Sequence, residues 1–247
     1  MNKKTKYLIC YLLLLFSVNA ISTAVAQNKK ILVFAKTAGF YHQSIPVGIA
    51  ALQKLGAENK FAVDTTKDAA VFTAANLKQY AAVVFLSTTG DVLNDEQQKA
   101  FEQYVQAGGG FVGIHAATDT EYGWPWYGKL VGAYFVKHPE QQMATLQIVD
   151  RKSIATRHLP ATWARKDEWY NFKDIQPDLH VLIKLDESTY KGGSNGTDHP
   201  MAWYHNYDGG RAFYTGLGHV DASYTDPLFL KHLLGGLQYA MGIKRMK

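Results

Sequence analysis

The chain has 247 residues, of which 47% are hydrophobic and 19% charged, and its formal net charge is +5. This composition excludes a disordered tail and suits one folded domain or two small ones. Three lysines precede an apolar run over residues 7–18, and Ala24-Val25-Ala26 follows as a small-residue cleavage site. That order predicts a secretory signal peptide over residues 1–26 and a mature chain, residues 27–247, that is periplasmic or secreted.

The predicted leader changes what the charge implies about partners. It holds three lysines and no acid, so the net charge of the mature chain falls to +2, and no Lys/Arg cluster remains. The mature chain has no apolar run of the ~20 residues that cross a bilayer, although an uncleaved leader would be an anchor. We therefore expect neither nucleic acid nor a membrane as partner after leader removal, and oligomerisation stays open.

The only cysteine, Cys10, lies in the predicted leader. Its removal excludes disulfides, thiolate catalysis and cysteine-bound metal sites from the mature protein. The nine histidines all lie in the mature chain, so they become the main candidates for chemistry near neutral pH.

Short apolar runs alternate with helical patterns in the first half of the chain. Strands are expected at residues 31–34, 61–63, 82–86 and 111–114, and helices at residues 44–56 and 94–108. This alternation predicts an α/β fold with an open, mostly parallel sheet and helices on both faces. Further strands are expected at residues 145–149, 181–185, 202–204 and 211–214, followed by a helix that Asp226 caps and Gly242 ends. Without a linker or repeat, a single domain is favoured.

Two of the predicted strand ends carry residues suited to chemistry. Residues 36–42 follow the first strand, and their Lys36, Phe40 and His42 could line the crevice that forms at such strand ends; an ordinary connecting loop is the alternative. His115 follows a fully apolar strand in the same way, so we expect it in that crevice, with a structural histidine as the alternative. The three glycines before that strand are a helix stop and turn, since phosphate loops follow a strand.

Aromatic and acidic residues provide the other candidates. Trp124 and Trp126 offer rigid faces that stack on sugar rings, although aromatic filler over the sheet is an equal alternative. Asp167 and Glu168 are adjacent carboxylates suited to acid and base work if the fold raises one pKa; otherwise they form a solvated turn. The remaining candidates are Asp119, His138, His199, Trp203, Arg211 and His219.

A metal site would have to be assembled by the fold. No local H-x-x-x-H spacing occurs, so a divalent ion held by His115, His138, Glu168 and His219 stays an open alternative. A Ser-His-Asp triad is disfavoured because the chain has no G-x-S-x-G elbow.

Several motifs, in order along the mature chain, resemble the ThuA-like, or trehalose utilisation, family. They are Gly39-Phe40-Tyr41-His42, residues 85–91, residues 108–119, Asp167-Glu168-Trp169-Tyr170, residues 199–203 and residues 210–219. The resemblance implies a flavodoxin-like fold of the class I glutamine amidotransferase type over residues 27–247. In those enzymes a cysteine nucleophile occupies the position that corresponds to His115, so glutaminase activity is not carried over.

The family resemblance also implies a set of crevice residues and a field of function. The motif positions are His42, His115, Asp119, His138, Asp167, Glu168, Tyr170, His199, Trp203, Arg211 and His219. Family members occur near sugar oxidoreductases, which favours an exported enzyme that acts on an oxidised (keto) sugar or glycoside.

In this hypothesis His115, Asp167, Glu168 and His219 would move protons, while the other candidates bind the carbohydrate. The alternatives are a non-catalytic sugar-binding module and, less favoured, a protein-interaction domain without chemistry.

Overall fold

A nine-stranded sheet forms the centre of the computed structural model, which describes residues 29–247. The strand order is β2-β1-β3-β4-β11-β10-β9-β6-β7. The strands are β1 (Lys30–Phe34), β2 (Ala62–Thr66), β3 (Ala82–Leu86), β4 (Gly110–Ile114), β6 (Gln142–Ile148), β7 (Thr162–Asp167), β9 (His180–Asp186), β10 (Pro200–Tyr207) and β11 (Gly210–Thr215). A separate pair is formed by β5 (Tyr134–Lys137) and β8 (Asn171–Lys173). The predicted leader lies outside the described residues.

The sheet is mixed, with a parallel half and an antiparallel half. The ladders that join β2, β1, β3, β4 and β11 are parallel, whereas all ladders from β11 to β7 are antiparallel. The prediction of a mostly parallel sheet is therefore wrong for the second half. One cause is the hairpin between β10 and β11, where Asp208 and Gly209 both have positive φ, as the tight turns of antiparallel hairpins require.

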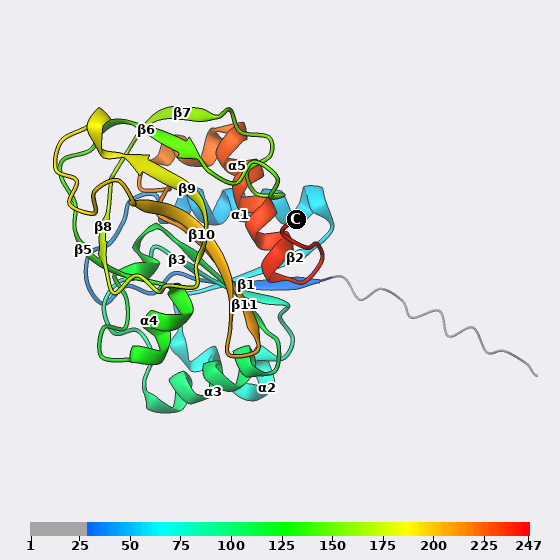
Figure 1. The fold of residues 1–247 in the computed structure, drawn as a ribbon. Coiled ribbons are helices and arrows are strands. Elements are labelled where there is room, and N and C mark those ends of the chain that lie inside the picture. Colours follow the sequence, from blue (N-terminus) through cyan, green and yellow to red (C-terminus); the bar gives the residue numbers. More distant parts are fainter. Residues whose placement is uncertain (1–28) are drawn as a thin grey trace, which may run out of the picture.

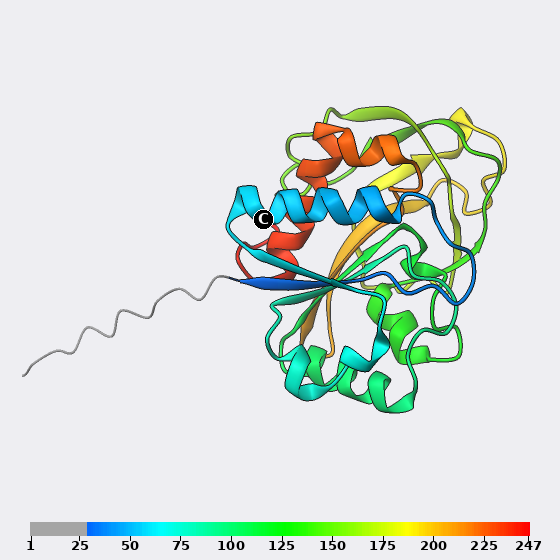
Figure 2. The same cartoon turned by 180° about the vertical axis from the view of Figure 1, so that it is seen from behind.

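Helices cover both faces of this sheet, as predicted. Figures 1 and 2 show α1 (Ile45–Asn59) and α5 (Pro227–Ala240) on one face, and α2 (Ala74–Leu77), α3 (Asp95–Gln106) and α4 (Pro125–Val131) on the other. Because the central strands β3 and β4 are covered on both sides, every residue in them is buried, which explains their uninterrupted apolar sequences.

Side chains cap two of the three longer helices, and the expected cap at Asp226 is one of them. Asn94 and Gln97 form a reciprocal capping box at α3, and the Asp226 side chain accepts the amide of Leu228 at α5. Ser44 does not cap α1; its hydroxyl instead donates to the carbonyl oxygen of Gly218, 3.1 Å away. Ser44 thus ties the start of α1 to the loop after β11.

All eight expected strands are present, and β5, β7 and β8 are additions. In β7, buried and exposed residues alternate, but the buried positions include Arg165 and Asp167 as well as Trp163. A strand whose inward face carries charges escapes a search for apolar alternation. No helix among residues 29–247 is long and apolar enough to cross a membrane.

Candidate functional site

His115 occupies a strained backbone position at the end of β4. It opens the short 3₁₀ turn η2 (His115–Thr118) with a φ of 51°, a left-handed conformation that residues with a Cβ seldom adopt. Its ring is fully buried, and Nδ1 lies 3.0 Å from the carbonyl oxygen of Gly216. A carbonyl oxygen only accepts, so Nδ1 carries the proton and Nε2 presents its lone pair. Such strain persists where the surrounding structure enforces it, and it often marks functional sites.

Three other side chains converge on His115. Its Nε2 lies 3.1 Å from Nδ1 of His219 and 3.4 Å from Oε2 of Glu168, while the latter two atoms are 3.0 Å apart. His42 completes the group, since each of the four residues offers one ligand atom within 4.8 Å of the others. We call these four residues the histidine–glutamate cluster. They follow β1, β4, β7 and β11, so both halves of the sheet supply them.

Burial and mutual contact set the protonation of the cluster. Burial, together with the neighbouring imidazoles of His115 and His219, lowers the pKa of His42 to about 2. Burial alone would raise the pKa of Glu168, but its close contact with the imidazoles of His115 and His219 outweighs this effect and holds that pKa well below its usual range. At neutral pH the cluster therefore combines a neutral His42 with an ionised Glu168.

Asp167 holds the backbone of two cluster residues, Glu168 and His219, in place. Its fully buried carboxylate accepts the backbone N–H groups of Glu168, Gly218 and His219 at 3.0–3.2 Å. Arg165 pairs with it at 3.2 Å. These bonds join the end of β7 to the loop after β11, although the two strands are four places apart in the sheet. The geometry gives Asp167 a positioning role.

His138 lies at the more exposed side of the cluster. Its side chain is 40% exposed, and Nδ1 lies 3.3 Å from Oε1 of Glu168 and 3.0 Å from the carbonyl oxygen of Pro139. Both neighbours accept, so Nδ1 carries the proton and Nε2 is free to accept another. The Tyr170 ring stacks on His138 and also contacts His115, with centroids 5.8 and 4.4 Å away. Burial raises the pKa of Tyr170 well above its ordinary value, which keeps its hydroxyl protonated.

Other predicted ligand contacts lie around this group. The Phe40 ring is 65% exposed and its centroid lies 4.9 Å from that of His42. Asp119 accepts the Tyr122 hydroxyl at 2.7 Å, and burial raises the pKa of this carboxyl. His199 binds the carbonyl oxygen of Tyr170 through Nε2 at 2.7 Å, so it positions that residue from behind.

Five of the predicted site residues are bonded elsewhere in the fold. The Lys36 ammonium donates to the carbonyl oxygen of Val92. The indole N–H groups of the three tryptophans are bonded within the fold, Trp124 to Glu102, Trp126 to Asp208 and Trp203 to the carbonyl oxygen of Val131. Arg211 bonds the carbonyl oxygens of Gly108 and Ala240, next to the start of β4 rather than its end.

Two residues near the site were not predicted. The Gln141 amide nitrogen lies 2.8 Å from Nε2 of His219, and Arg165 is buried beside Asp167. The position of Gln141 just after His138-Pro139 gave no signal of its own. The alternation in β7, which points Arg165 and Asp167 inward together, was the available signal for Arg165.

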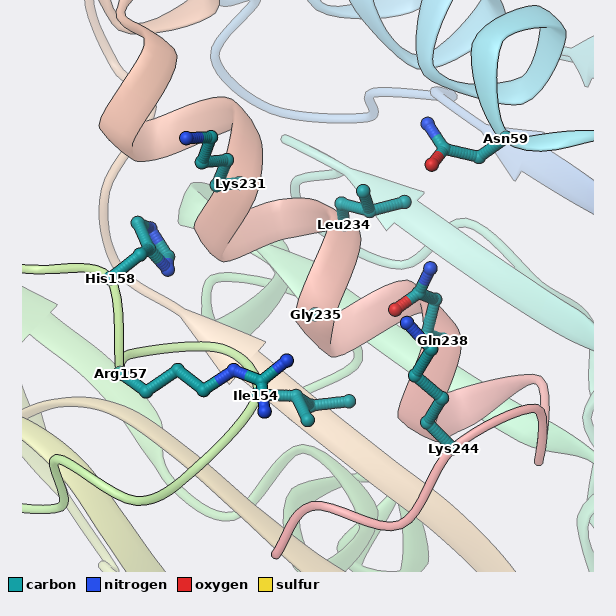
Figure 3. A pocket seen from close by; sticks show the side chains of 9 residues that line it. All are labelled: Asn59, Ile154, Arg157, His158, Lys231, Leu234, Gly235, Gln238 and Lys244. Carbon is teal, nitrogen blue, oxygen red and sulfur yellow. The ribbon is translucent and has the colours of Figure 1, made fainter.

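A separate hollow runs along α5. Figure 3 shows its lining, in which Lys231, Leu234, Gly235 and Gln238 come from α5 and the other side chains approach from neighbouring loops and the end of α1. Its basic residues are Arg157, His158, Lys231 and Lys244. None of the cluster residues lines it.

The fold and cluster define an α/β protein with a buried, partly ionised site at the carboxyl ends of its parallel strands. The family model for ThuA, described as trehalose utilisation, matches residues 30–240, and the chain belongs to this family. No curated protein matched the chain in a sequence comparison.

Solved structures with this fold include other ThuA-like proteins. One from Bacteroides uniformis is 25% identical, with a TM-score of 0.76 over 88% of this chain and 93% of that one. Another, from Parabacteroides merdae, is 24% identical, with a TM-score of 0.74 over 90% and 92% of the two chains. A β-galactosidase from Bacillus circulans shares the fold over 87% of this chain and 31% of its own, at 12% identity and a TM-score of 0.58.

Proposed function

We propose that the protein is an exported enzyme of carbohydrate catabolism that moves protons on a keto sugar or keto glycoside. The main support for this function is the histidine–glutamate cluster with His138 beside it. These residues lie at the strand ends, where open α/β sheets bind their ligands. Membership of the trehalose utilisation family supports a carbohydrate as substrate. The strand order β2-β1-β3-β4-β11 supports a flavodoxin-like core for the fold.

His138 has the geometry of a general base. Its Nδ1 proton is held between Glu168 and Pro139, so the lone pair on Nε2 remains for a substrate proton. A C–H bond beside a sugar carbonyl is the acidic group it would attack. As His138 takes that proton, the C–H electron pair becomes a C=C bond and the carbonyl π pair moves onto oxygen.

The resulting oxyanion would be stabilised by a hydrogen-bond donor beside the carbonyl, the role that fixed polar groups fill in many enzymes. Delivery of the proton to the former carbonyl carbon, with transfer of a proton from the neighbouring hydroxyl to the oxyanion so that a new carbonyl forms there, completes an isomerisation. Departure of an alkoxide from the next carbon, with a proton supplied to it, completes an elimination instead. Tyr170 stays protonated because burial raises its pKa. Its ring stacks on His138 and its hydroxyl lies 3.4 Å from Nε2 of His42, so it is the proposed proton donor.

Proton exchange in heavy water tests this function. The mature protein is mixed in D₂O with 3-keto glycosides and with the parent glycosides, and proton NMR follows the signal of the carbon beside the carbonyl. We expect loss of that signal for the keto sugars alone, even where no net product forms.

A pair of histidine variants supplies the control. Replacing a general base costs roughly 10²- to 10⁴-fold in rate, so His138→Gln should slow the exchange by that amount. His158→Gln should not slow it, because His158 is bonded to the carbonyl oxygen of Leu228 and lines the hollow along α5. Sugar binding without exchange would assign a binding module instead, and equal exchange in all three proteins would remove His138 from the mechanism.

A further inference from the structure

We propose that the histidine–glutamate cluster binds one divalent first-row transition-metal ion, with His42, His115, Glu168 and His219 as ligands. This inference deepens the proposed function, on which it rests for the role of the ion, which is to polarise a substrate oxygen. Three imidazole nitrogens and one carboxylate oxygen form a donor set that suits zinc and similar ions.

The spacing of three of the four donor atoms fits the coordination sphere of one ion, and the His42 donor lies within 4.8 Å of each of them. Two ligands about 2.05 Å from a tetrahedral zinc ion lie about 3.3 Å from each other. The three separations among Nε2 of His115, Nδ1 of His219 and Oε2 of Glu168 are 3.1, 3.4 and 3.0 Å. The same three atoms would form a hydrogen-bonded network only with protons placed between them.

The tautomer of His115 argues against a proton on its cluster-facing nitrogen. Because Nδ1 donates to the carbonyl oxygen of Gly216, Nε2 presents a lone pair to the cluster. Histidine ligands of metal ions are held in this way, by a hydrogen bond from the other ring nitrogen to a backbone carbonyl or carboxylate. The Gln141 amide nitrogen lies 2.8 Å from Nε2 of His219, so Nδ1 is the nitrogen of this ring that faces the cluster.

His42 and Glu168 complete the argument. His42 is buried, and its Nδ1 has no hydrogen-bond partner among the described residues, so this nitrogen is available to an ion. The second oxygen of Glu168 is bonded to His138, which leaves Oε2 for the ion. His138, a ligand candidate from the sequence, thus lies one bond outside the proposed coordination sphere, and His42 takes its place.

Direct metal binding tests the inference without reference to any sugar. Tag-free mature protein is dialysed against a chelator, titrated with Zn²⁺ by calorimetry, and analysed for metal content by mass spectrometry. We expect one ion per chain, and we expect Co²⁺ at the same site to give the intense visible absorption of a four-coordinate centre. Failure of the wild-type chain to hold either ion would overturn the proposal.

Matched variants locate the ion. His115→Gln and Glu168→Gln should each weaken Zn²⁺ binding by roughly 100-fold or more, because loss of a partner outside the coordination sphere already costs 10–100-fold. His205→Gln is the control, since His205 is equally buried but is bonded to the carbonyl oxygen of Leu130. Circular dichroism confirms folding of each variant, and unchanged binding in both cluster variants would overturn the assignment.

The outcome separates this inference from the proposed function. If the protein binds the metal but exchanges no sugar proton, the metal site stands and the proposed enzymatic function is wrong. Full exchange of the sugar proton by metal-free protein, with chelator present, would show that the reaction needs no ion. That result would overturn the role proposed for the metal and leave the enzymatic function in place.

Discussion

Replacement of Asp167 by Asn should destabilise the fold more than almost any other change of one charge. The carboxylate is fully buried, accepts three backbone N–H groups and pairs with Arg165, whose side chain is only 8% exposed. Asparagine keeps the shape but offers one oxygen instead of two. Its NH₂ group would therefore face an N–H donor, and Arg165 would lose the closer of its two carboxylate partners.

The size of the effect follows from burial. Removal of one partner of a buried ion pair costs about 3–5 kcal/mol, because the remaining charge is left without compensation in a poorly solvated place. With an m-value of about 2 kcal/mol/M, the urea midpoint should fall by roughly 1.5–2.5 M. Urea unfolding followed by circular dichroism measures this shift.

Asp226→Asn is the matched control. Asp226 lies 3.6 Å from the same arginine but its side chain is 29% exposed, and asparagine caps a helix as well as aspartate does. Its loss should cost about 1 kcal/mol or less. If Asp167→Asn unfolds at the same urea concentration as the wild type, the positioning role assigned to Asp167 is wrong.

Three further predictions concern the leader, the core and pH. Mass spectrometry of exported protein should find Gln27 as the first residue; material that retains residues 1–26 would contradict the cleavage site. Trp203→Phe should lower the free energy of unfolding by about 1–3 kcal/mol, because it leaves the buried carbonyl oxygen of Val131 without its donor, while calorimetric sugar affinity stays unchanged. Burial lowers the pKa of His232 to about 4, so the unfolded chain binds the proton first and stability falls as the pH drops from 6.5 toward 4. His232 should account for about 2 kcal/mol of the loss at pH 5, so His232→Gln should show a shallower decline in urea unfolding between pH 7 and 5; an identical decline would refute this.

The parallel half of the fold was predictable in its five strands and in α1 and α3, because these elements carry local signals, whereas the short helices α2 and α4 were not predicted. β3 and β4 are apolar throughout, and the capping box of α3 is visible as Asn94 and Gln97. The antiparallel half was less accessible. β7 directs Arg165 and Asp167 inward, and these charges become tolerable only through a pairing that the sequence does not reveal.

The candidate site was predictable in part, because local sequence signals mark some of its residues. His115 stands out because an apolar strand leads directly to it, and the family motifs pointed to Glu168 and His219. Sequence spacing does not determine which side chains of different loops meet. Thus His42, expected only as a ligand contact, joins the cluster, while the tryptophans chosen for their chemistry bond elsewhere.

The wide spread of the cluster along the chain has a practical consequence. Its members lie between residues 42 and 219, so an unfolded chain does not hold them together. A ligand that needs all four binds the native protein alone and stabilises it by mass action, by about 2.7 kcal/mol at one hundred times its dissociation constant. For a chain of this size that corresponds to a rise of roughly 5–11 °C in melting temperature. Ions, sugars and keto sugars can therefore be screened by heat alone, before any reaction is known.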